Sequence, residues 1–377
     1  EMLRSLVGSE MCIRDRSITI EHIRAALRAA QDPNTGLDLG VSVKDRDIQL
    51  AGDRVALTLE LGYPADAVRD QVRDVAVAAL AAAGAPGAQV TVSWKVAAHA
   101  VQKGLKPLPN VRNIIAVASG KGGVGKSTTA VNLALALAAE GAKVGLLDAD
   151  IYGPSVPTML GISGRPESLD NKSMEPLTGH GLQANSIGFL IDADSPAIWR
   201  GPMVTQALEQ LLRQTNWRDL DYLIVDMPPG TGDVALTLAQ KVPVVGAVIV
   251  TTPQDVALLD ARKGLRMFQK VDVPILGVVE NMAIHICSQC GHAEHIFGEG
   301  GGRRMAEQYD TPWLGSLPLT LAIREQTDAG TPTVVADPAS EAAALYRGIA
   351  RKLAAGVAAL PRDMAGKFPS IVVQQPT

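Results

Sequence analysis

Residues 120–127, GKGGVGKS, carry the clearest chemistry in the sequence. They match G-x-x-x-x-G-K-[ST], the pattern of a phosphate-binding loop, and Lys126 and Ser127 occupy its last two positions. The glycines let backbone N–H groups curl around phosphate oxygens, Lys126 supplies charge at the β- and γ-phosphates, and the Ser127 hydroxyl is a ligand for Mg²⁺. The motif predicts ATP binding by Gly120, Lys121, Gly122, Gly123, Val124, Gly125, Lys126, Ser127 and Thr128.

A second lysine, Lys121, lies inside the same loop. The phosphate chemistry of one subunit needs only Lys126, so the extra positive charge requires its own explanation.

Carboxylates follow two of the apolar runs near this loop. Asp226 ends DYLIVD and is placed to hold Mg²⁺ through water, and we assign Asp148 to Mg²⁺ as well. Asp150 lies farther from its strand and is our candidate for positioning the attacking water. An aspartate at a strand end can instead cap the next helix, but α/β sheets bind ligands at these ends, which favours function.

Cys287 and Cys290 form a C-x-x-C pair within IHICSQCGHAEHIFGEGGG. Two thiolates bind one edge of a metal centre but do not close it. One solution is Zn²⁺ held within a subunit with His292 and His295; another is a centre shared by two subunits. A redox pair or an inert buried pair are weaker alternatives, since the pair does not open a helix after a strand and its surroundings are polar and Gly-rich.

These residues require an α/β domain to position them, which we place at residues 113–360. Apolar runs alternate there with helical segments, and such runs are typical of buried strands in a mostly parallel sheet. Residues 336–360 predict a closing amphipathic helix. The predicted strands are NIIAVAS, AKVGLLDAD, DYLIVDMPP, VGAVIVTTP and VPILGVVEN.

The rest of the chain predicts less chemistry. Residues 17–94 indicate a small α+β domain of order α-β-β-α-β, in which Thr19 caps the first helix and Gly84 ends the second. Residues 95–112 are interpreted as a linker, with His99 as a surface or linker residue, and residues 361–377 as a tail. Residues 1–16 fit nothing that follows and are interpreted as a non-native or disordered leader. Trp199 and Trp217 are expected to be packing residues.

The composition excludes some functional classes. A net charge of −4 gives no reason to expect binding to nucleic acid or to a membrane, and no apolar run reaches the length of a spanning helix. Three cysteines do not make a disulfide framework, so we expect a reducing, cytoplasmic location.

Several motifs together resemble one family. KGGVGKST with Lys121 is similar to the deviant Walker A motif of the MinD/ParA/nitrogenase-iron-protein group, and DADIYGPSVP, WRGPM, DYLIVDMPPGTGD and VVENM…CSQCG…IFGEGGG resemble its Mrp/ApbC branch. The N-terminal part resembles the iron–sulfur-assembly domain often fused to these ATPases. The resemblance implies a homodimer in which Lys121 reaches the partner's phosphates, a γ-phosphate switch at residues 230–233, and Asn281 at the adenine edge.

The family resemblance and the residues lead to one favoured function. We expect an ATP-hydrolysing iron–sulfur carrier in which Lys121, Lys126 and Asp150 act in catalysis. Cys287 and Cys290 of two subunits would bridge one [4Fe–4S] cluster for transfer to apo target proteins. The alternative is a MinD/ParA-like positioning ATPase with zinc or inert cysteines. We do not expect residues 361–377, which contain prolines, to form the basic amphipathic helix that MinD-like membrane binding requires, and a positioning role does not explain the cysteines.

Overall fold

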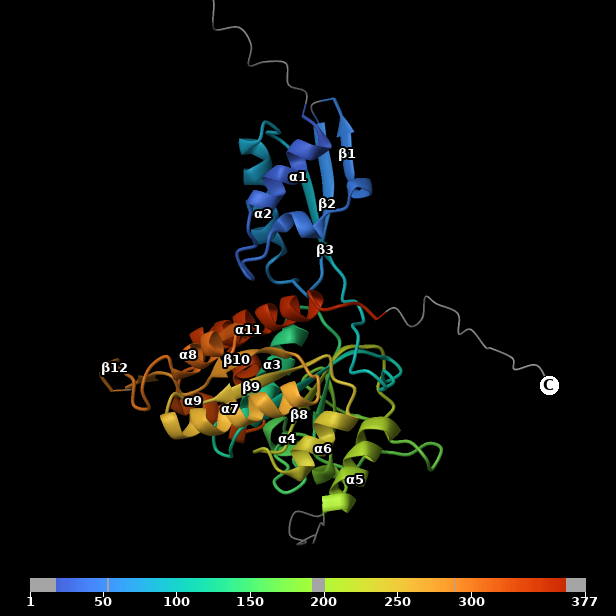
Figure 1. Ribbon diagram of the computed structural model, residues 1–377, viewed down its shortest axis with the longest axis vertical. Coiled ribbons are helices and arrows are strands. Elements are labelled where there is room, and N and C mark those ends of the chain that lie inside the picture. The colour runs from blue at the N-terminus through green and yellow to red at the C-terminus, as the bar shows by residue number, and fades with distance from the viewer. Residues whose placement is uncertain (1–17, 53, 192–200, 288, 364–377) are drawn as a thin grey trace, which may run out of the picture. The chain divides into compact units, whose positions relative to one another are not determined.

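The computed structural model describes residues 18–52, 54–191, 201–287 and 289–363 (Figure 1). The predicted leader, Trp199 and most of the predicted tail lie outside these ranges. The chain forms two compact units, one made of residues 1–61 and 67–95, the other of residues 62–66 and 96–377.

The N-terminal unit is a three-stranded mixed sheet with helices, in the order that the sequence predicts. The sheet order is β1-β2-β3, with β1 antiparallel and β3 parallel to β2. Thr19 accepts a hydrogen bond from the His22 N–H at the start of the first helix, and Gly84 adopts a φ of 97° after the second. The elements are α1 (Ile20–Ala29), two 3₁₀ turns (Leu39–Ser42 and Asp45–Asp47), β1 (Ile48–Ala51), β2 (Arg54–Leu61), α2 (Arg69–Ala82) and β3 (Gln89–Trp94).

The second unit contains an eight-stranded sheet of order β13-β10-β9-β4-β8-β5-β7-β6. Every pairing is parallel except that of the edge strand β6 with β7, which confirms the mostly parallel α/β prediction. The β6–β7 hairpin was not predicted. The strands are β4 (Val111–Ser119), β5 (Val144–Asp148), β6 (Leu177–Gly179), β7 (Leu182–Ser186), β8 (Leu220–Asp226), β9 (Gly246–Thr251), β10 (Ile275–Glu280) and β13 (Trp313–Ser316).

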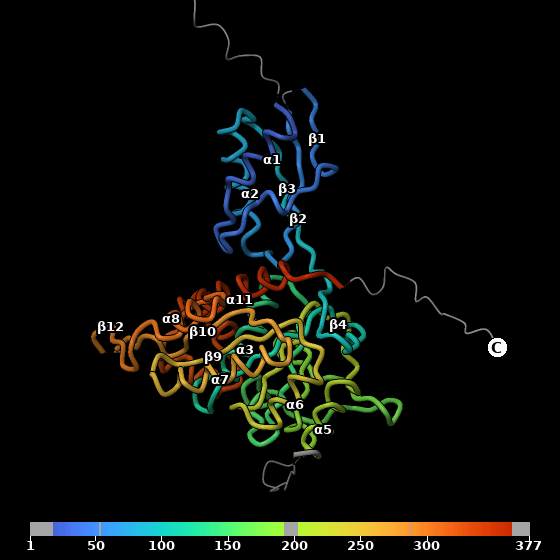
Figure 2. Tube along the Cα trace, viewed as in Figure 1, coloured from blue at the N-terminus to red at the C-terminus, as the bar shows by residue number. Residues whose placement is uncertain are grey.

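Helices cover both faces of this sheet. On one face α3 contacts β4, β5 and β8, and α11 packs on α3; on the other, α5, α6 and α7 pack in series (Figure 2). No described helix is long and apolar enough to cross a membrane. The helices are α3 (Lys126–Ala139), α4 (Val156–Met159), a 3₁₀ turn (Ile187–Phe189), α5 (Gly201–Gln214), α6 (Asp233–Lys241), α7 (Asp255–Lys270), α8 (Gly301–Gln308), α9 (Leu321–Asp328), α10 (Thr333–Ala336) and α11 (Glu341–Ala358).

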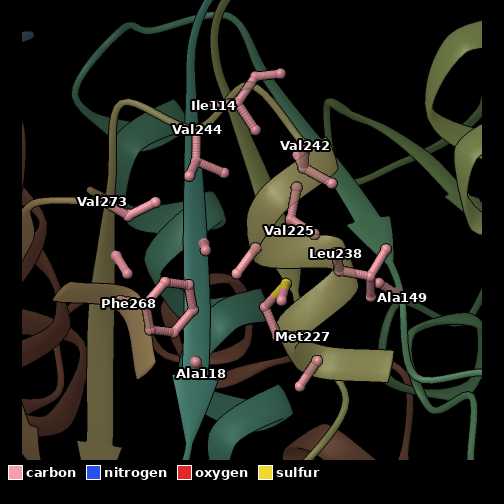
Figure 3. Close-up of a cluster of buried hydrophobic side chains, with 14 of the residues drawn as sticks. Ile114, Ala118, Ala149, Val225, Met227, Leu238, Val242, Val244, Phe268 and Val273 are labelled. Atoms are coloured by element: carbon pink, nitrogen blue, oxygen red, sulfur yellow. The ribbon is translucent and has the colours of Figure 1, made fainter. Parts of the chain in front are cut away.

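The core explains why the strands read as continuous apolar runs. Ile114 and Ala118 of β4 belong to a buried cluster with Leu238 of α6 and Phe268 of α7 (Figure 3). Ile115, the neighbour of Ile114, is also fully buried because helices cover the other face. Burial on both sides fixes the strands, so their carboxyl ends meet at one edge of the sheet.

The predicted linker segment is partly incorporated into the second unit. His99 is 2% exposed, and its Nδ1 lies 2.9 Å from the Asn113 Oδ1. The Ala100 N–H donates to the Pro361 carbonyl. The surface position predicted for His99 was therefore wrong: the residue is buried at the start of β4, where Asn113 provides it with a polar partner.

Candidate nucleotide site and cysteine hairpin

The phosphate-binding loop connects the end of β4 to the start of α3. Gly123 and Gly125 both adopt a φ of 79°, a conformation that glycine reaches without strain. A Cβ on Gly120 would lie 2.1 Å from the backbone carbon of Asp260 in α7, so no larger residue fits there. The Ser119 hydroxyl donates to the Lys121 carbonyl at 2.9 Å. Sequence and packing together therefore determine the curled backbone that the motif implied.

Lys126 lies at the centre of the candidate nucleotide site. Its Nζ is 2.6 Å from the Asp226 Oδ1, 3.2 Å from the Ser127 Oγ and 4.0 Å from the Asp150 Oδ2. The Lys126 side chain is 6% exposed and that of Asp226 is fully buried. The fold thus gathers four of the predicted residues from three separate elements, β8, the start of α3 and the loop after β5.

Asp226 has the properties of a ligand for a hard cation. Its Oδ2 is buried and has no hydrogen-bond partner among the described residues, whereas such atoms are ordinarily partnered. With the Ser127 hydroxyl it offers the oxygen ligands that Mg²⁺ prefers. Bound Mg²⁺ would supply electrostatic stabilisation of the β- and γ-phosphate oxygens. The residues present therefore fit the magnesium site expected from the sequence.

Asp148 is held differently from Asp226. Its Oδ2 accepts hydrogen bonds from the Ser155 N–H, the Val156 N–H and the Ser186 hydroxyl, and its Oδ1 accepts one from the Asp150 N–H. Burial, together with the nearby Asp226 carboxylate, raises its pKa to about 7. Both oxygens are occupied, which favours the capping alternative over Mg²⁺ binding. Ser186, which the sequence analysis did not identify, lies on the unpredicted β7.

Asp150 lies in the loop that Asp148 shapes. Its side chain is 14% exposed. Burial raises its pKa, while the nearby Lys126 ammonium acts in the opposite direction. This position, between the P-loop lysine and the surface, suits the role of orienting a water molecule, which stays a prediction.

Lys121 contrasts with Lys126. It is half-exposed, and its Nζ forms no ion pair within the described part of the chain. Gly122 and Gly123 beside it are exposed, so this arm of the loop faces outward. The structure leaves Lys121 available for the partner contact that the resemblance implies.

Asn281, predicted at the adenine edge, supports the loop from behind. Its Nδ2 donates to the Val124 carbonyl at 2.9 Å, and its backbone N–H donates to the Thr251 carbonyl. A Cβ on Gly125 would lie 2.1 Å from the Asn281 Nδ2. The amide group therefore packs directly on the loop, and contact with a base remains a prediction. Among the predicted switch residues, Gly230 donates its N–H to the Ser119 carbonyl.

The cysteines lie at the turn of a small hairpin formed by β11 (His285–Ile286) and β12 (Ala293–Glu294). The Cys287 N–H donates to the His292 carbonyl at 2.9 Å, and the Cys287 carbonyl accepts from the Gly291 N–H. Cys290 is exposed and Cys287 half-buried. Hydrogen bonds from the backbone N–H of Gln289, and then from the N–H and thiol of Cys290, lower the pKa of Cys287.

The hairpin histidines do not join this pair. The His295 Nδ1 lies 2.7 Å from the Ala283 carbonyl, and the His285 Nδ1 lies 3.1 Å from the Leu319 carbonyl. Within the described ranges, no three His, Cys, Asp or Glu side chains gather as a metal site. The zinc alternative required both cysteines with His292 and His295, and one chain does not assemble that set.

Comparison with known families agrees with this geometry. The family described as NUBPL iron-transfer P-loop NTPase (ParA) matches residues 110–354. The chain belongs to this family. A second family, described as iron–sulfur cluster assembly protein, matches residues 20–94. Both matches confirm the resemblance drawn from KGGVGKST and its companion motifs, and they show that the chain is a P-loop NTPase.

Relatives of this P-loop NTPase share most of its length. An iron–sulfur cluster carrier protein of Pseudomonas fragi is 62% identical over 269 residues, covering 71% of this chain and 94% of its own. One from Haemophilus influenzae is 50% identical over 333 residues, covering 88% and 90%. A solved nucleotide-binding protein from Archaeoglobus fulgidus, in complex with ADP, is 36% identical with a TM-score of 0.52, covering 59% of this chain and 87% of that one.

Proposed function

We propose that this P-loop NTPase is a cytoplasmic, ATP-hydrolysing carrier of iron–sulfur clusters. Two subunits hold one [4Fe–4S] cluster between their Cys287 and Cys290 side chains and deliver it to apo target proteins. The names of the relatives support cluster carriage. The observation that carries the proposal is that both cysteines lie in the turn of one short hairpin, with Cys290 exposed.

The number of ligands supports a shared cluster. A [4Fe–4S] cluster is ordinarily held by four thiolates, and each chain offers two at the hairpin. A two-fold axis through the cluster would supply the other two from the same surface of a second copy. The lowered pKa of Cys287 favours the thiolate form that binds iron. Because Cys290 is exposed, an acceptor protein could also reach a cluster bound there.

The nucleotide site suggests how ATP would act on such a dimer. Lys126 is paired with Asp226 at 2.6 Å in the structure. The phosphates of ATP compete for Lys126 and release the Asp226 carboxylate, so binding rearranges the loop and its neighbours. The outward-facing Lys121 then reaches the phosphates of the partner subunit, which tightens the dimer, and Asp150 orients the attacking water. Hydrolysis removes the γ-phosphate and relaxes the dimer.

Anaerobic reconstitution with iron and sulfide tests the proposal. We expect a brown protein with about four irons per two chains. Its cluster should move to an apo acceptor that requires [4Fe–4S]. The Cys287→Ala/Cys290→Ala double variant should lack the chromophore while binding ATP as the wild type does. One tightly held zinc per chain without a chromophore would overturn the carrier proposal and leave a dimeric ATPase.

A further inference from the structure

Two consecutive residues, the last of β10 and the one that follows it, contact the two functional regions. Asn281 donates to the Val124 carbonyl of the phosphate-binding loop. Glu280, 1% exposed, accepts a hydrogen bond on its Oε2 from the Gly302 N–H at 2.5 Å. Gly302 lies in the first turn of α8, the helix that follows the cysteine hairpin. The last residue of β10 therefore contacts α8, and the residue that follows it contacts the phosphate-binding loop.

The segment that carries the cysteines is anchored at both ends near this point. At its start, the Ala283 N–H donates to the Leu317 carbonyl, which fixes the chain two residues beyond Asn281. In its middle, the His295 Nδ1 forms a hydrogen bond with the Ala283 carbonyl. At its end, Gly302 is held by Glu280. These contacts attach the hairpin to the end of β10, so a shift of the strand end also shifts the hairpin.

The first residues of α8 pack closely against their neighbours, with no room for a side chain. A Cβ on Gly302 would lie 3.1 Å from both the Cβ and the Oε2 of Glu280. One on Gly301 would lie 2.6 Å from the Pro253 carbonyl oxygen. A carboxylate at this position also compensates the positive end of the α8 dipole. A displacement of Glu280 must therefore displace the start of α8, because the glycines are already in close contact with their neighbours.

We propose that Glu280 is a positioning residue that transmits the nucleotide state of the phosphate-binding loop to the cysteine hairpin. The biological meaning of this inference rests on the proposed function. The contacts of Glu280 and Asn281 on which it is built lie within a single chain. When the loop N–H groups turn toward phosphate, the Val124 carbonyl turns with them and the Asn281 amide follows. The adjacent Glu280 shifts, and α8 and the hairpin shift with it.

Thiol alkylation of the cluster-free protein by iodoacetamide measures this coupling. In the wild type, ATP with Mg²⁺ should change the alkylation rate of the hairpin cysteines at least about fivefold, the lower end of ordinary coupling between sites. Glu280→Ala should bring that ratio close to one while ATP affinity and basal ATPase activity stay unchanged. Glu280→Gln keeps an acceptor oxygen and should restore part of the ratio. Glu299→Gln, an exposed carboxylate of the same segment, is the matched control and should behave as the wild type.

Two results would overturn the inference: a wild-type alkylation rate that ignores nucleotide, or a Glu280→Ala protein that keeps the full ratio. If Glu280→Ala does not fold, Gly302→Ala tests the same contact from the side of α8 and should also reduce the ratio. The alkylation measurement needs no cluster, so its result is independent of reconstitution. If alkylation shows no coupling but a cluster forms, the role of Glu280 is refuted and the carrier proposal stands. If alkylation shows coupling but no cluster forms, only the carrier proposal is refuted.

Discussion

The phosphate-binding loop and the cysteine hairpin lie near the same edge of one sheet, yet their side chains are held in opposite ways. Lys126 and Asp226 are buried and paired at 2.6 Å. Cys290 is exposed, and each chain supplies only two thiols to the hairpin site. The loop is supported by Ser119, Asn281 and α7, whereas the hairpin pairs over only two residues on each strand.

This difference teaches what each region can do. A buried lysine and carboxylate, held by well-supported elements of the sheet, bind charged phosphates and Mg²⁺ with defined geometry. A pair of thiols, one of them exposed, that needs a second chain to complete its site can take up a ligand and release it. A carrier driven by nucleotide requires both properties in one molecule. Variants of the loop and variants of the hairpin can test the two properties separately.

The largest expected effect comes from Lys126→Ala. It leaves the buried Asp226 unpaired, which typically costs about 3–5 kcal/mol of folding stability. It also removes the phosphate contact, which we expect to weaken ATP binding by roughly 2–5 kcal/mol. Thermal unfolding and nucleotide titration measure the two effects. Iron content after reconstitution should stay at the wild-type level, and its loss would show that the two regions are not separable.

Gly125→Ala should have the next largest effect. The methyl group meets the Asn281 Nδ2 at 2.1 Å and forces an L-residue into a φ of 79°. Such strain costs about 1–3 kcal/mol, expressed as a lower melting temperature and weaker ATP binding. Gly122→Ala is the matched control, because nothing lies within 4 Å of its Cβ and its φ is not in the left-handed region. Equal losses in both variants would contradict the support that we assign to Asn281.

The pH dependence of stability should change in Asp148→Asn. The pKa of Asp148 is raised from 3.8 to about 7, so between these values the folded protein binds a proton that the unfolded chain does not. This contribution to stability is present at low pH and is lost as pH rises toward 7. Melting temperatures across this range should therefore fall less steeply in the variant than in the wild type. Parallel curves would show that Asp148 is charged throughout.

The smallest effect is expected for His292→Ala. This residue holds Cys287 through its backbone carbonyl, which the substitution retains, and its side chain is exposed. Iron content, chromophore and ATP binding should all match the wild type. A loss of bound metal, measured by elemental analysis, would identify the imidazole as a ligand and revive the zinc alternative.

Much of the fold could be predicted because local patterns determine it. The apolar runs that end at Ser119, Asp226 and Glu280 form strands in the structure. Helices bury these strands on both faces, so consecutive residues along them are apolar and the runs are recognisable in the sequence. The glycine spacing around Lys126 placed the loop between strand and helix. Thr19 capped its helix as expected, because the capping bond is local.

The remaining features could not be predicted because they depend on contacts between residues that are far apart in the sequence. The type of residue at Asp148 is equally consistent with Mg²⁺ binding and capping. The contacts that favour capping come from the backbone N–H groups of the following loop and from Ser186 on an unpredicted strand. The sequence analysis assigned no role to Glu280, because its partner, Gly302, is 22 residues away. His99 was interpreted as a surface or linker residue because its partner Asn113 lies 14 residues further along the chain. A signal for Glu280 existed, since a carboxylate closing an apolar strand needs a donor.

The most direct test of the central claim is native mass spectrometry of the reconstituted protein. The account predicts one species of two chains carrying four irons and four sulfides, absent from the Cys287→Ala/Cys290→Ala variant. A metal centre on a single chain, or a dimer whose cluster survives loss of both cysteines, would contradict it.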